Sequence, residues 1–198
     1  MTGRPRLVVT GGSGFLGTHV IPRMIRDTKV YAHHFCGLGN DEQPYWRDVG
    51  TIEAYFDANM DLCNIKPQLN LYREDWPTYT LWHNDPPAKT VFSEPGEGRR
   101  AEVVDTLLAP GTVVSGAKIR RSVLSNLVYI DEGASLDECI VMRGARVGKN
   151  CKLKRCIIDK WNQVPDGTVI GYDREADLAR FTVSSTGIVV VPQRQQRW

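Results

Sequence analysis

A glycine run near the start of the sequence has the spacing of a phosphate-binding loop. Gly11, Gly14 and Gly17 lie three residues apart and follow a short apolar run at residues 6–9. Glycines at such spacing let a backbone turn approach a pyrophosphate at the N-terminus of the following helix. The run is therefore our first candidate for cofactor binding.

A second group that could do chemistry precedes a predicted helix. Trp46, Arg47 and Asp48 come just before Thr51, which suits the N-cap of a helix that ends near residue 62. A carboxylate beside a guanidinium at a helix start suits a site where Mg²⁺ and a phosphate meet. The residue chemistry also fits an ordinary structural pair of an arginine and an aspartate, and taken alone it favours that interpretation.

The cysteines and histidines do not predict a metal site. None of the five cysteines forms a C-x-x-C pair, and no histidine lies at ligand spacing from them, which argues against zinc. Cys139 and Cys156 are 17 residues apart and would stack on adjacent coils within disulfide reach. In a reducing compartment we expect them to be thiols that fill space.

The elements that must position these residues are dominated by a 17-residue repeat in the second half of the chain. Four rows align without gaps, at residues 113–129, 130–146, 147–163 and 164–180. The first column of the repeat is Val113, Ile130, Val147 and Val164. The fourth column is Gly116, Gly133, Asn150 and Gly167, residue types that tolerate a left-handed backbone, with positive φ, at a corner. This period fits three short strands and three corners per coil, which predicts a parallel, left-handed β-helix of hexapeptide-type coils. The fold class is therefore mostly β.

The repeat suggests the organisation of the chain from residue 63 onward. Residues 63–100 contain prolines and aromatics and read as an extended connection, and residues 101–198 read as the β-helix domain with a C-terminal cap. In that cap, Asp173 is suited to begin a short helix, and residues 182–191 form a predicted hairpin.

Composition narrows the class of protein further. The chain has 198 residues and a formal net charge of +2, which is too small to argue for nucleic acid or an acidic membrane surface. No stretch has the length and apolarity of a membrane span, and the start has too many glycines for a secretory signal. We therefore expect a cytoplasmic protein.

The string from Pro44 to Thr51 resembles the signature that closes the catalytic domain of ADP-glucose pyrophosphorylase, also called glucose-1-phosphate adenylyltransferase. The resemblance covers roughly residues 20–191 of the sequence. It continues through the blocks Val20-Ile21-Pro22, Asp75-Trp76-Pro77, Pro86-Pro87-Ala88-Lys89, Ser122-Val123-Leu124, Arg155-Cys156-Ile157-Ile158-Asp159, Val169-Ile170-Gly171 and Gly187-Ile188-Val189-Val190.

The resemblance implies a reaction and a set of site residues. The family converts ATP and glucose 1-phosphate to ADP-glucose and pyrophosphate for glycogen synthesis, with Mg²⁺, usually as a homotetramer. By this resemblance Asp48 is the catalytic residue, holding the metal and the sugar phosphate, while Trp46 and Arg47 shape the substrate pocket. Family regulation uses basic groups near the β-helix, for which the candidates are Lys160, Arg194 and Arg197; surface solvation is the alternative for each.

The start of the chain departs from this family. The family begins with a glycine-rich, arginine-bearing loop and a long α/β domain, neither of which is found here. Residues 10–17 instead resemble the nucleotide loop of extended short-chain dehydrogenases and epimerases. The acidic residue and the Tyr-x-x-x-Lys of that family are missing, so NAD binding is not expected. Residues 1–62 are thus interpreted as a truncated α/β remnant of a nucleotidyltransferase domain with an atypical start, and the chain alone is expected to be inactive.

Two alternatives belong to other classes. Trimeric acyltransferases share the hexapeptide coils but need a histidine base. All four histidines, His19, His33, His34 and His83, precede the first coil. The other alternative is a non-catalytic module whose coils provide surface for assembly or regulation.

Overall fold

The computed structural model divides the chain into two compact units, residues Met1–Pro44 and Tyr45–Trp198. The residues it describes are 16–31, 45–74, 77–80, 83–91 and 100–193. In the first unit they form a short π-helix, η1 (Leu16–Val20), and the helix α1 (Ile21–Asp27). Pro22 lies in the first turn of α1, where its missing N–H breaks no helical hydrogen bond.

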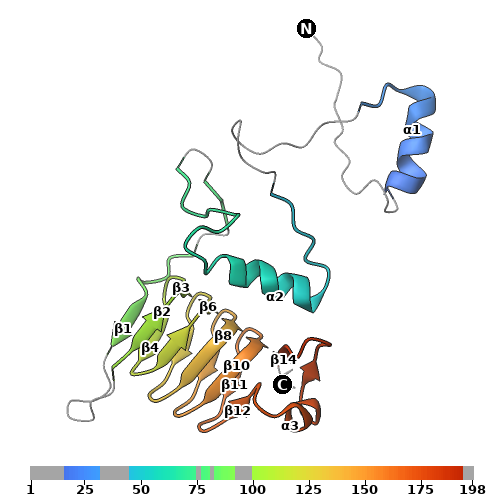
Figure 1. Ribbon diagram of the computed structural model, residues 1–198. Coiled ribbons are helices and arrows are strands. Elements are labelled where there is room, and N and C mark those ends of the chain that lie inside the picture. The colour runs from blue at the N-terminus through green and yellow to red at the C-terminus, as the bar shows by residue number, and fades with distance from the viewer. Residues whose placement is uncertain (1–15, 32–44, 75–76, 81–82, 92–99, 194–198) are drawn as a thin grey trace, which may run out of the picture. The chain divides into compact units, whose positions relative to one another are not determined.

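The second unit is a β-helix with one long helix packed on it (Figure 1). Its helices are α2 (Ile52–Asp61) and α3 (Arg174–Leu178). Its strands are β1 (Lys89–Val91), β2 (Glu102–Val104), β3 (Leu107–Leu108), β4 (Val113–Ser115), β5 (Lys118–Arg120), β6 (Val123–Leu124), β7 (Tyr129–Ile130), β8 (Ser135–Val141), β9 (Arg146–Val147), β10 (Lys152–Ile158), β11 (Gln163–Val164), β12 (Val169–Ile170), β13 (Thr182–Val183) and β14 (Val189–Val191). No helix in these stretches is both long and apolar enough to cross a membrane.

The strands stack into the faces of a prism. One face is the parallel sheet β1-β4-β7-β9-β11. The long strands β8 and β10 each bend at a corner and serve two faces: their first halves pair with β5 and β12, and their second halves with β6 and β14. The mostly β fold and the parallel stacking of 17-residue coils predicted from the sequence are thus confirmed.

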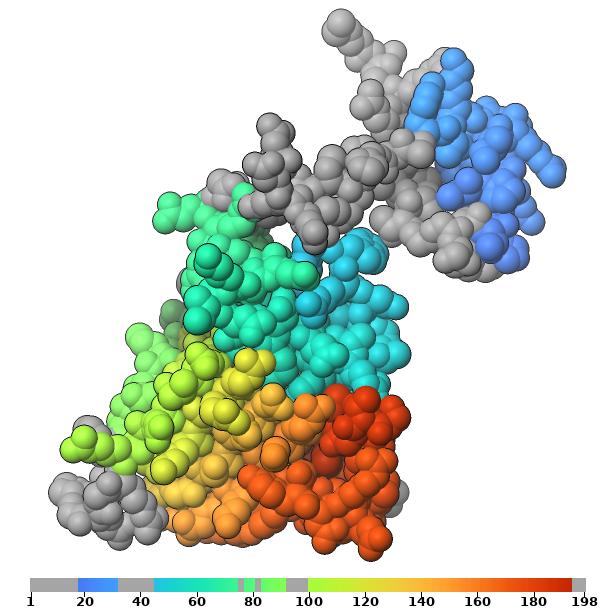
Figure 2. Space-filling model, viewed as in Figure 1, coloured from blue at the N-terminus to red at the C-terminus, as the bar shows by residue number. Residues whose placement is uncertain are grey.

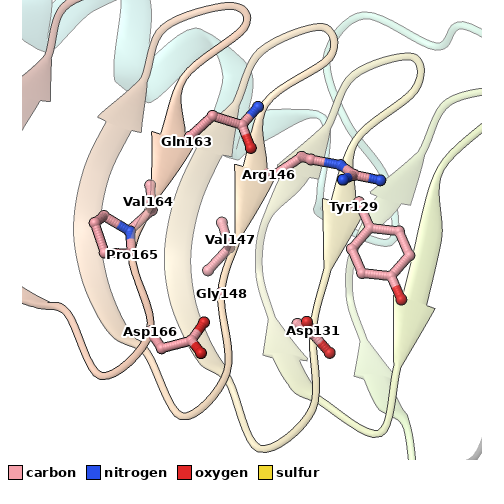
Figure 3. A pocket seen from close by; sticks show the side chains of 9 residues that line it. All are labelled: Tyr129, Asp131, Arg146, Val147, Gly148, Gln163, Val164, Pro165 and Asp166. Atoms are coloured by element: carbon pink, nitrogen blue, oxygen red, sulfur yellow. The ribbon is translucent and has the colours of Figure 1, made fainter.

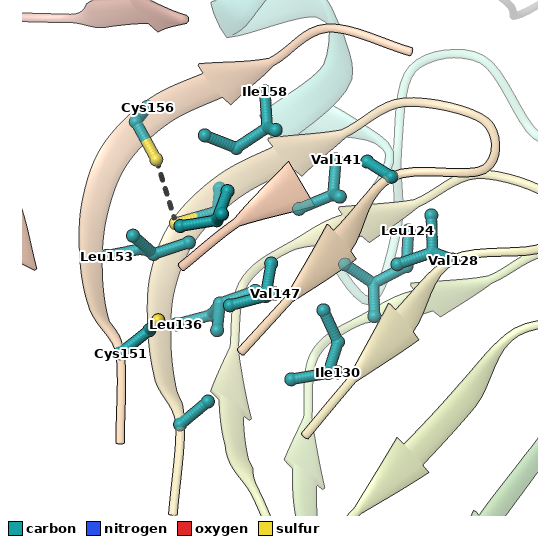
Figure 4. Packing of buried hydrophobic residues seen from close by; sticks show 14 of the residues in the cluster. Leu124, Val128, Ile130, Leu136, Val141, Val147, Cys151, Leu153, Cys156 and Ile158 are labelled. Atoms are coloured by element: carbon teal, nitrogen blue, oxygen red, sulfur yellow. Dashed lines mark hydrogen bonds between the residues drawn. The ribbon is translucent and has the colours of Figure 1, made fainter. Parts of the chain in front are cut away.

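The inside of the prism is filled by one aliphatic side chain above another (Figure 4). Ile119, Leu136, Leu153 and Ile170 form one such column, and each is at most 2% exposed. Since strands repeat every 4.8 Å or so along the stack, each of these side chains contacts the one above and the one below. The apolar core therefore runs continuously through the coils.

The gap-free alignment of the repeat was wrong in the first coil. Val114, not Val113, pairs with Ile130, whereas Ile119 pairs with Leu136 as predicted. The first coil thus has one residue fewer between its first two faces, and Val114 is fully buried while Val113 is only partly buried. Two adjacent valines hid the shift because either fits an apolar column.

The corner residues and the C-terminal cap have the conformations that the sequence predicts. The predicted corner residues all have positive φ: Gly116 (54°), Gly133 (69°), Asn150 (55°) and Gly167 (70°). Asp173 caps α3 by accepting from the amides of Glu175 and Ala176, and β13 pairs antiparallel with β14. The domain boundaries at residues 62 and 100 stay predictions; the structure adds that β1 already pairs with β4, so the stacking begins before residue 101.

Candidate functional site

Asp48 lies at the entrance to α2 and helps to shape the turn there. Its Oδ1 accepts a hydrogen bond of 3.0 Å from the amide of Gly50, and its side chain is exposed. Three residues after Asp48, the Thr51 hydroxyl accepts from the amide of Ala54 at 3.1 Å and caps the helix as predicted. The candidate catalytic carboxylate is therefore fixed by local backbone at the positive end of the helix dipole.

Arg47 does not pair with Asp48, so the structural ion pair considered for these two residues is not formed. Its Nη2 lies 3.5 Å from Oδ2 of Asp61, at the far end of α2, and 3.3 Å from Oε1 of Gln68. Arg47 thus ties the segment before α2 to the segment after it. Trp46 is 68% exposed.

An apolar contact holds α2 on the coils. Phe56 is 1% exposed and packs in a cluster with Ile140, Ile157 and Ile188 from β8, β10 and the C-terminal hairpin. The guanidinium of Arg155 lies 5.5 Å from the centre of the Phe56 ring, within range of a cation–π interaction. Figure 2 shows α2 and the residues after it lying directly against the coils.

A polar contact joins the first turn of α2 to the C-terminal hairpin. The Ser185 hydroxyl donates to Oε1 of Glu53 at 3.0 Å. A hydrogen bond from its own backbone amide and then those from Ser185 and Ser184 lower the pKa of Glu53 below its ordinary value of 4.5. Glu53 is therefore held as a carboxylate at this junction.

A groove of about 400 Å³ lies between the start of α2 and the coils. It is lined by Val49, Gly50, Thr51, Ile52, Tyr55, Met142, Ile157, Asp159, Val190 and Pro192. The structure thereby brings together the segment after Asp48 and the residue before Lys160, two positions far apart in the sequence. Asp48 and Lys160 themselves do not line the groove.

Lys160 itself is exposed at a coil corner, beside a carboxylate rather than in a basic cluster. Oδ1 of Asp159 accepts from the backbone amide of Lys160 at 2.7 Å, and Oδ2 accepts from the amide of Gln193 at 3.1 Å. This neighbouring negative charge opposes the binding of an anion at Lys160. The other candidates for effector binding, Arg194 and Arg197, lie outside the described residues.

The glycine run is described only at its end. Gly11 and Gly14 lie outside the described residues, and Gly17 is part of the π-helix η1. The structure therefore leaves the predicted phosphate turn, and the expectation that NAD does not bind, as predictions.

A smaller hollow of about 280 Å³ lies on the outer face of β7, β9 and β11 (Figure 3). The charged side chains that line this hollow contact other residues of the coils. The guanidinium of Arg146 lies 5.0 Å from the centre of the Tyr129 ring, and Oδ1 of Asp166 accepts from the amide of Lys149 at 2.8 Å. We find in it no group directed at a ligand.

The carboxylates near α2 do not by themselves suit Mg²⁺. Asp48 offers one carboxylate, and its Oδ1 already accepts a backbone hydrogen bond. In the stretches that the structure describes, no group of three or more His, Cys, Asp or Glu side chains could hold a metal ion. Since Mg²⁺ requires near-octahedral oxygen coordination, a site at Asp48 would need ligands from elsewhere.

Coils stacked in this way, capped by a hairpin and carrying one docked helix, define a class of protein. The family model described as "GlmU-like, C-terminal hexapeptide" matches residues 86–191, more than half of the chain. The chain belongs to this family of hexapeptide β-helix proteins.

Curated relatives are more specific. The chain is 42% identical over 184 residues to the glucose-1-phosphate adenylyltransferase of Dechloromonas aromatica, covering 91% of the chain and 41% of the relative. It is 42% identical over 187 residues to the enzyme of that name from Trichlorobacter lovleyi (91% and 45%), and 45% identical over 179 residues to that from Hydrogenovibrio crunogenus (88% and 41%). The resemblance inferred from the sequence motifs is confirmed for the C-terminal part of these enzymes. The chain spans less than half the length of these relatives.

Sequence reasoning missed the residues that hold the candidate site in place. It did not identify the contact of Glu53 with Ser185, nor the partly buried pair in which the Arg143 guanidinium donates to both oxygens of Asp85 at 3.1 and 3.3 Å. One signal was present: Arg143 and Asn126 are 17 residues apart, and both bind Asp85. At this position of the repeat, two successive coils thus present polar side chains that bind the same partner outside the coils.

Proposed function

We propose that this chain serves glucose-1-phosphate adenylyltransferase chemistry, in which ATP and glucose 1-phosphate give ADP-glucose and pyrophosphate. Its part is that of a β-helix platform that fixes α2 and the segment containing Asp48. The observation that carries the proposal is the similarity to enzymes of that name over 91% of the chain, which includes a helix whose buried face packs on the coils. The nucleotidyl transfer itself needs groups beyond those described here.

Within this proposal, Asp48 contacts the sugar phosphate and shares a Mg²⁺ ion with ligands that the described residues do not supply. Trp46 and Arg47 border the same region, with Arg47 acting through Asp61 to hold the chain in place. What α2 contributes is orientation, because a carboxylate displaced by as little as 1 Å loses much of its effect on an in-line displacement. Lys160 follows Asp159, which lines the groove together with residues 49–52, and is the position proposed for an anionic effector, whose charge would have to outweigh the repulsion of the Asp159 carboxylate.

The setting of the function is proposed on the same similarity. The product would enter glycogen synthesis in the cytoplasm, and the working enzyme would be a homo-oligomer, namely a tetramer. The pathway, the compartment and the tetramer are all proposed from the resemblance to the family.

Two experiments test the proposal. In the first, the purified chain is assayed for pyrophosphate release with ATP, glucose 1-phosphate and Mg²⁺, and we expect no turnover. Formation of ADP-glucose would refute the statement that the transfer needs groups beyond the described residues. In the second, the matched C-terminal part of the Dechloromonas aromatica enzyme is replaced by that of this chain. We expect the chimera to make ADP-glucose, and a folded chimera without synthesis overturns the proposal.

Asp48 is tested in the same chimera. Asp48→Asn keeps an oxygen that can accept from Gly50 but removes the charge, so we expect a fall in kcat with little change in thermal stability. Glu102→Gln, an exposed carboxylate on a coil, is the matched control and should leave kcat unchanged. Equal kcat for the two variants would show that Asp48 only shapes the turn.

A further inference from the structure

Two cysteines lie side by side in the core of the coils (Figure 4). Cys139 on β8 and Cys156 on β10 are directly paired in the parallel register, and both are fully buried. Their Sγ atoms are 3.6 Å apart. Neighbouring strands are spaced about 4.8 Å apart, which falls within the Cα separations that disulfides span. The strand pairing and the distance between the sulfurs therefore place the two thiols within reach of a cross-link.

We propose that Cys139 and Cys156 are a redox-sensitive staple, a latent disulfide between consecutive coils. Forming the bond requires the sulfurs to approach to about 2.05 Å, which side-chain rotation supplies without a change of strand register. The oxidant is a small-molecule disulfide. One cysteine thiolate attacks it and releases one small thiol; the second thiolate attacks the mixed disulfide and releases the other. Two protein thiols become one disulfide, and the small disulfide is reduced to two thiols.

The surroundings of the pair explain why the thiols persist in the folded chain. The Cys156 thiol donates to Sγ of Cys139, which in turn donates to the carbonyl of Asp137 at 3.4 Å. The hydrogen bond with Cys139 and burial keep Cys156 protonated, because together they raise its pKa well above 9.0. Since the thiolate is the reacting species, oxidation has to proceed while the coils are open, during folding or local unfolding.

The consequence of the bond follows from where it lies. It would close a loop of one coil, and it would join β8 to β10, whose residues Ile140 and Ile157 pack against Phe56 of α2. A link across a loop of this length restricts the unfolded chain and so stabilises the folded one. Oxidation would therefore lock the platform under α2.

The full-length chain tests the staple with oxidised glutathione as the probe. Oxidation is followed by peptide mass mapping without reductant, in buffer and in urea near the unfolding midpoint. We expect the peptides containing Cys139 and Cys156 to become linked, about tenfold faster in urea because the coils open there. After urea is removed, the oxidised chain should unfold at a higher urea concentration, and reduction with dithiothreitol should reverse the shift.

Variants and contrary outcomes sharpen the test. Cys139→Ser and Cys156→Ser should each abolish the link and the shift, whereas Cys151→Ser, a change at another buried cysteine, should keep both. Mapping on the unsubstituted chain decides the matter even if a serine variant fails to fold. A disulfide that joins other cysteines, or an oxidised chain with an unchanged or lower midpoint, overturns the proposal.

Discussion

The coils and the helix docked on them are stabilised in different ways. Inside the coils, each apolar side chain repeats a contact made one coil earlier, so that Leu136 lies between Ile119 and Leu153. On α2, Phe56 and Met60 are the buried side chains, Ile52 and Tyr55 pack partly buried against the same cluster, and a single polar contact joins Glu53 to Ser185. Repetition makes the scaffold robust, while the segment containing Asp48 depends on a few contacts that occur once.

One corner column connects the two regions. Arg121, Glu138 and Arg155 are each 17 residues apart and have positive φ, which is uncommon outside glycine. Glu138 lies 3.6 Å from Arg121 and 3.2 Å from Arg155, so charges alternate along the column. The two arginines reach α2 and the turn after it, because Arg155 lies over the Phe56 ring and Arg121 donates to Asn64. Regular coils thus supply the surface on which the irregular segment docks.

The largest expected effect comes from Phe56→Ala, which should separate the two regions. Removing a buried phenylalanine side chain lowers the free energy of unfolding by about 3–5 kcal/mol. Here we expect the loss to fall mainly on the docking of α2 on the coils. Hydrogen exchange should show lost protection in α2 with β8 and β10 still protected. Leu153→Ala is the contrasting control, at about 2–5 kcal/mol, and should weaken the coils themselves. Equal loss of protection in coils and helix after Phe56→Ala would mean that the two regions unfold as one unit.

Asp85→Ala should have the next largest effect, at the junction between the proline-rich connection and the coils. It leaves Arg143 and Asn126 without their acceptor, and a lost hydrogen bond to a charged group costs about 1.5–3 kcal/mol. Because the Arg143 side chain is 29% exposed, we expect the lower part of that range. Urea unfolding measures it. Glu102→Ala should change stability by less than about 0.5 kcal/mol, and a similar loss in both variants would contradict a specific role for Asp85.

The β-helix could be predicted from the sequence because the same pattern of residue types recurs in every coil. Each coil independently places an aliphatic residue inside and a residue tolerant of positive φ at the corner, so one misread position, Val113, did not affect the others. The caps at Thr51 and Asp173 were predictable because their hydrogen bonds are local.

The site was less predictable because its contacts join distant residues with no period. Glu53 and Ser185 are 132 positions apart, and Asp85 and Arg143 are 58 apart. The groove that brings residues 49–52 to Asp159 exists only after α2 has docked. The motif around Asp48 identified the family, but nothing in its string of letters indicated that Arg47 would bind Asp61 instead of its neighbour.

A smaller effect is expected for Thr51→Ala at the start of α2. Loss of the cap leaves the amide of Ala54 without its side-chain acceptor and costs about 1 kcal/mol. Thr51→Ser keeps a hydroxyl and should retain most of the stability. If the region is held mainly by Phe56, then hydrogen exchange should increase in the first turn of α2 alone. An increase throughout the helix would show that the cap matters as much as the apolar contact.

The smallest effect is the acid sensitivity of the contact between Glu53 and Ser185, which distinguishes the helix from the coils by pH. The pKa of Glu53 is lower in the folded chain than its ordinary 4.5, so folding favours the carboxylate. This contribution is present above pH 4.5 and is lost as the pH falls through the folded pKa. The protection factors of the amides in the first turn of α2, which correct for the intrinsic pH dependence of exchange, should therefore fall on acidification below that value, while the buried aliphatic columns stay protected. In Glu53→Gln, whose amide oxygen still accepts from Ser185 but does not titrate, the first turn should lose most of this pH dependence. An unchanged pH profile in Glu53→Gln would assign the acid response to another carboxylate.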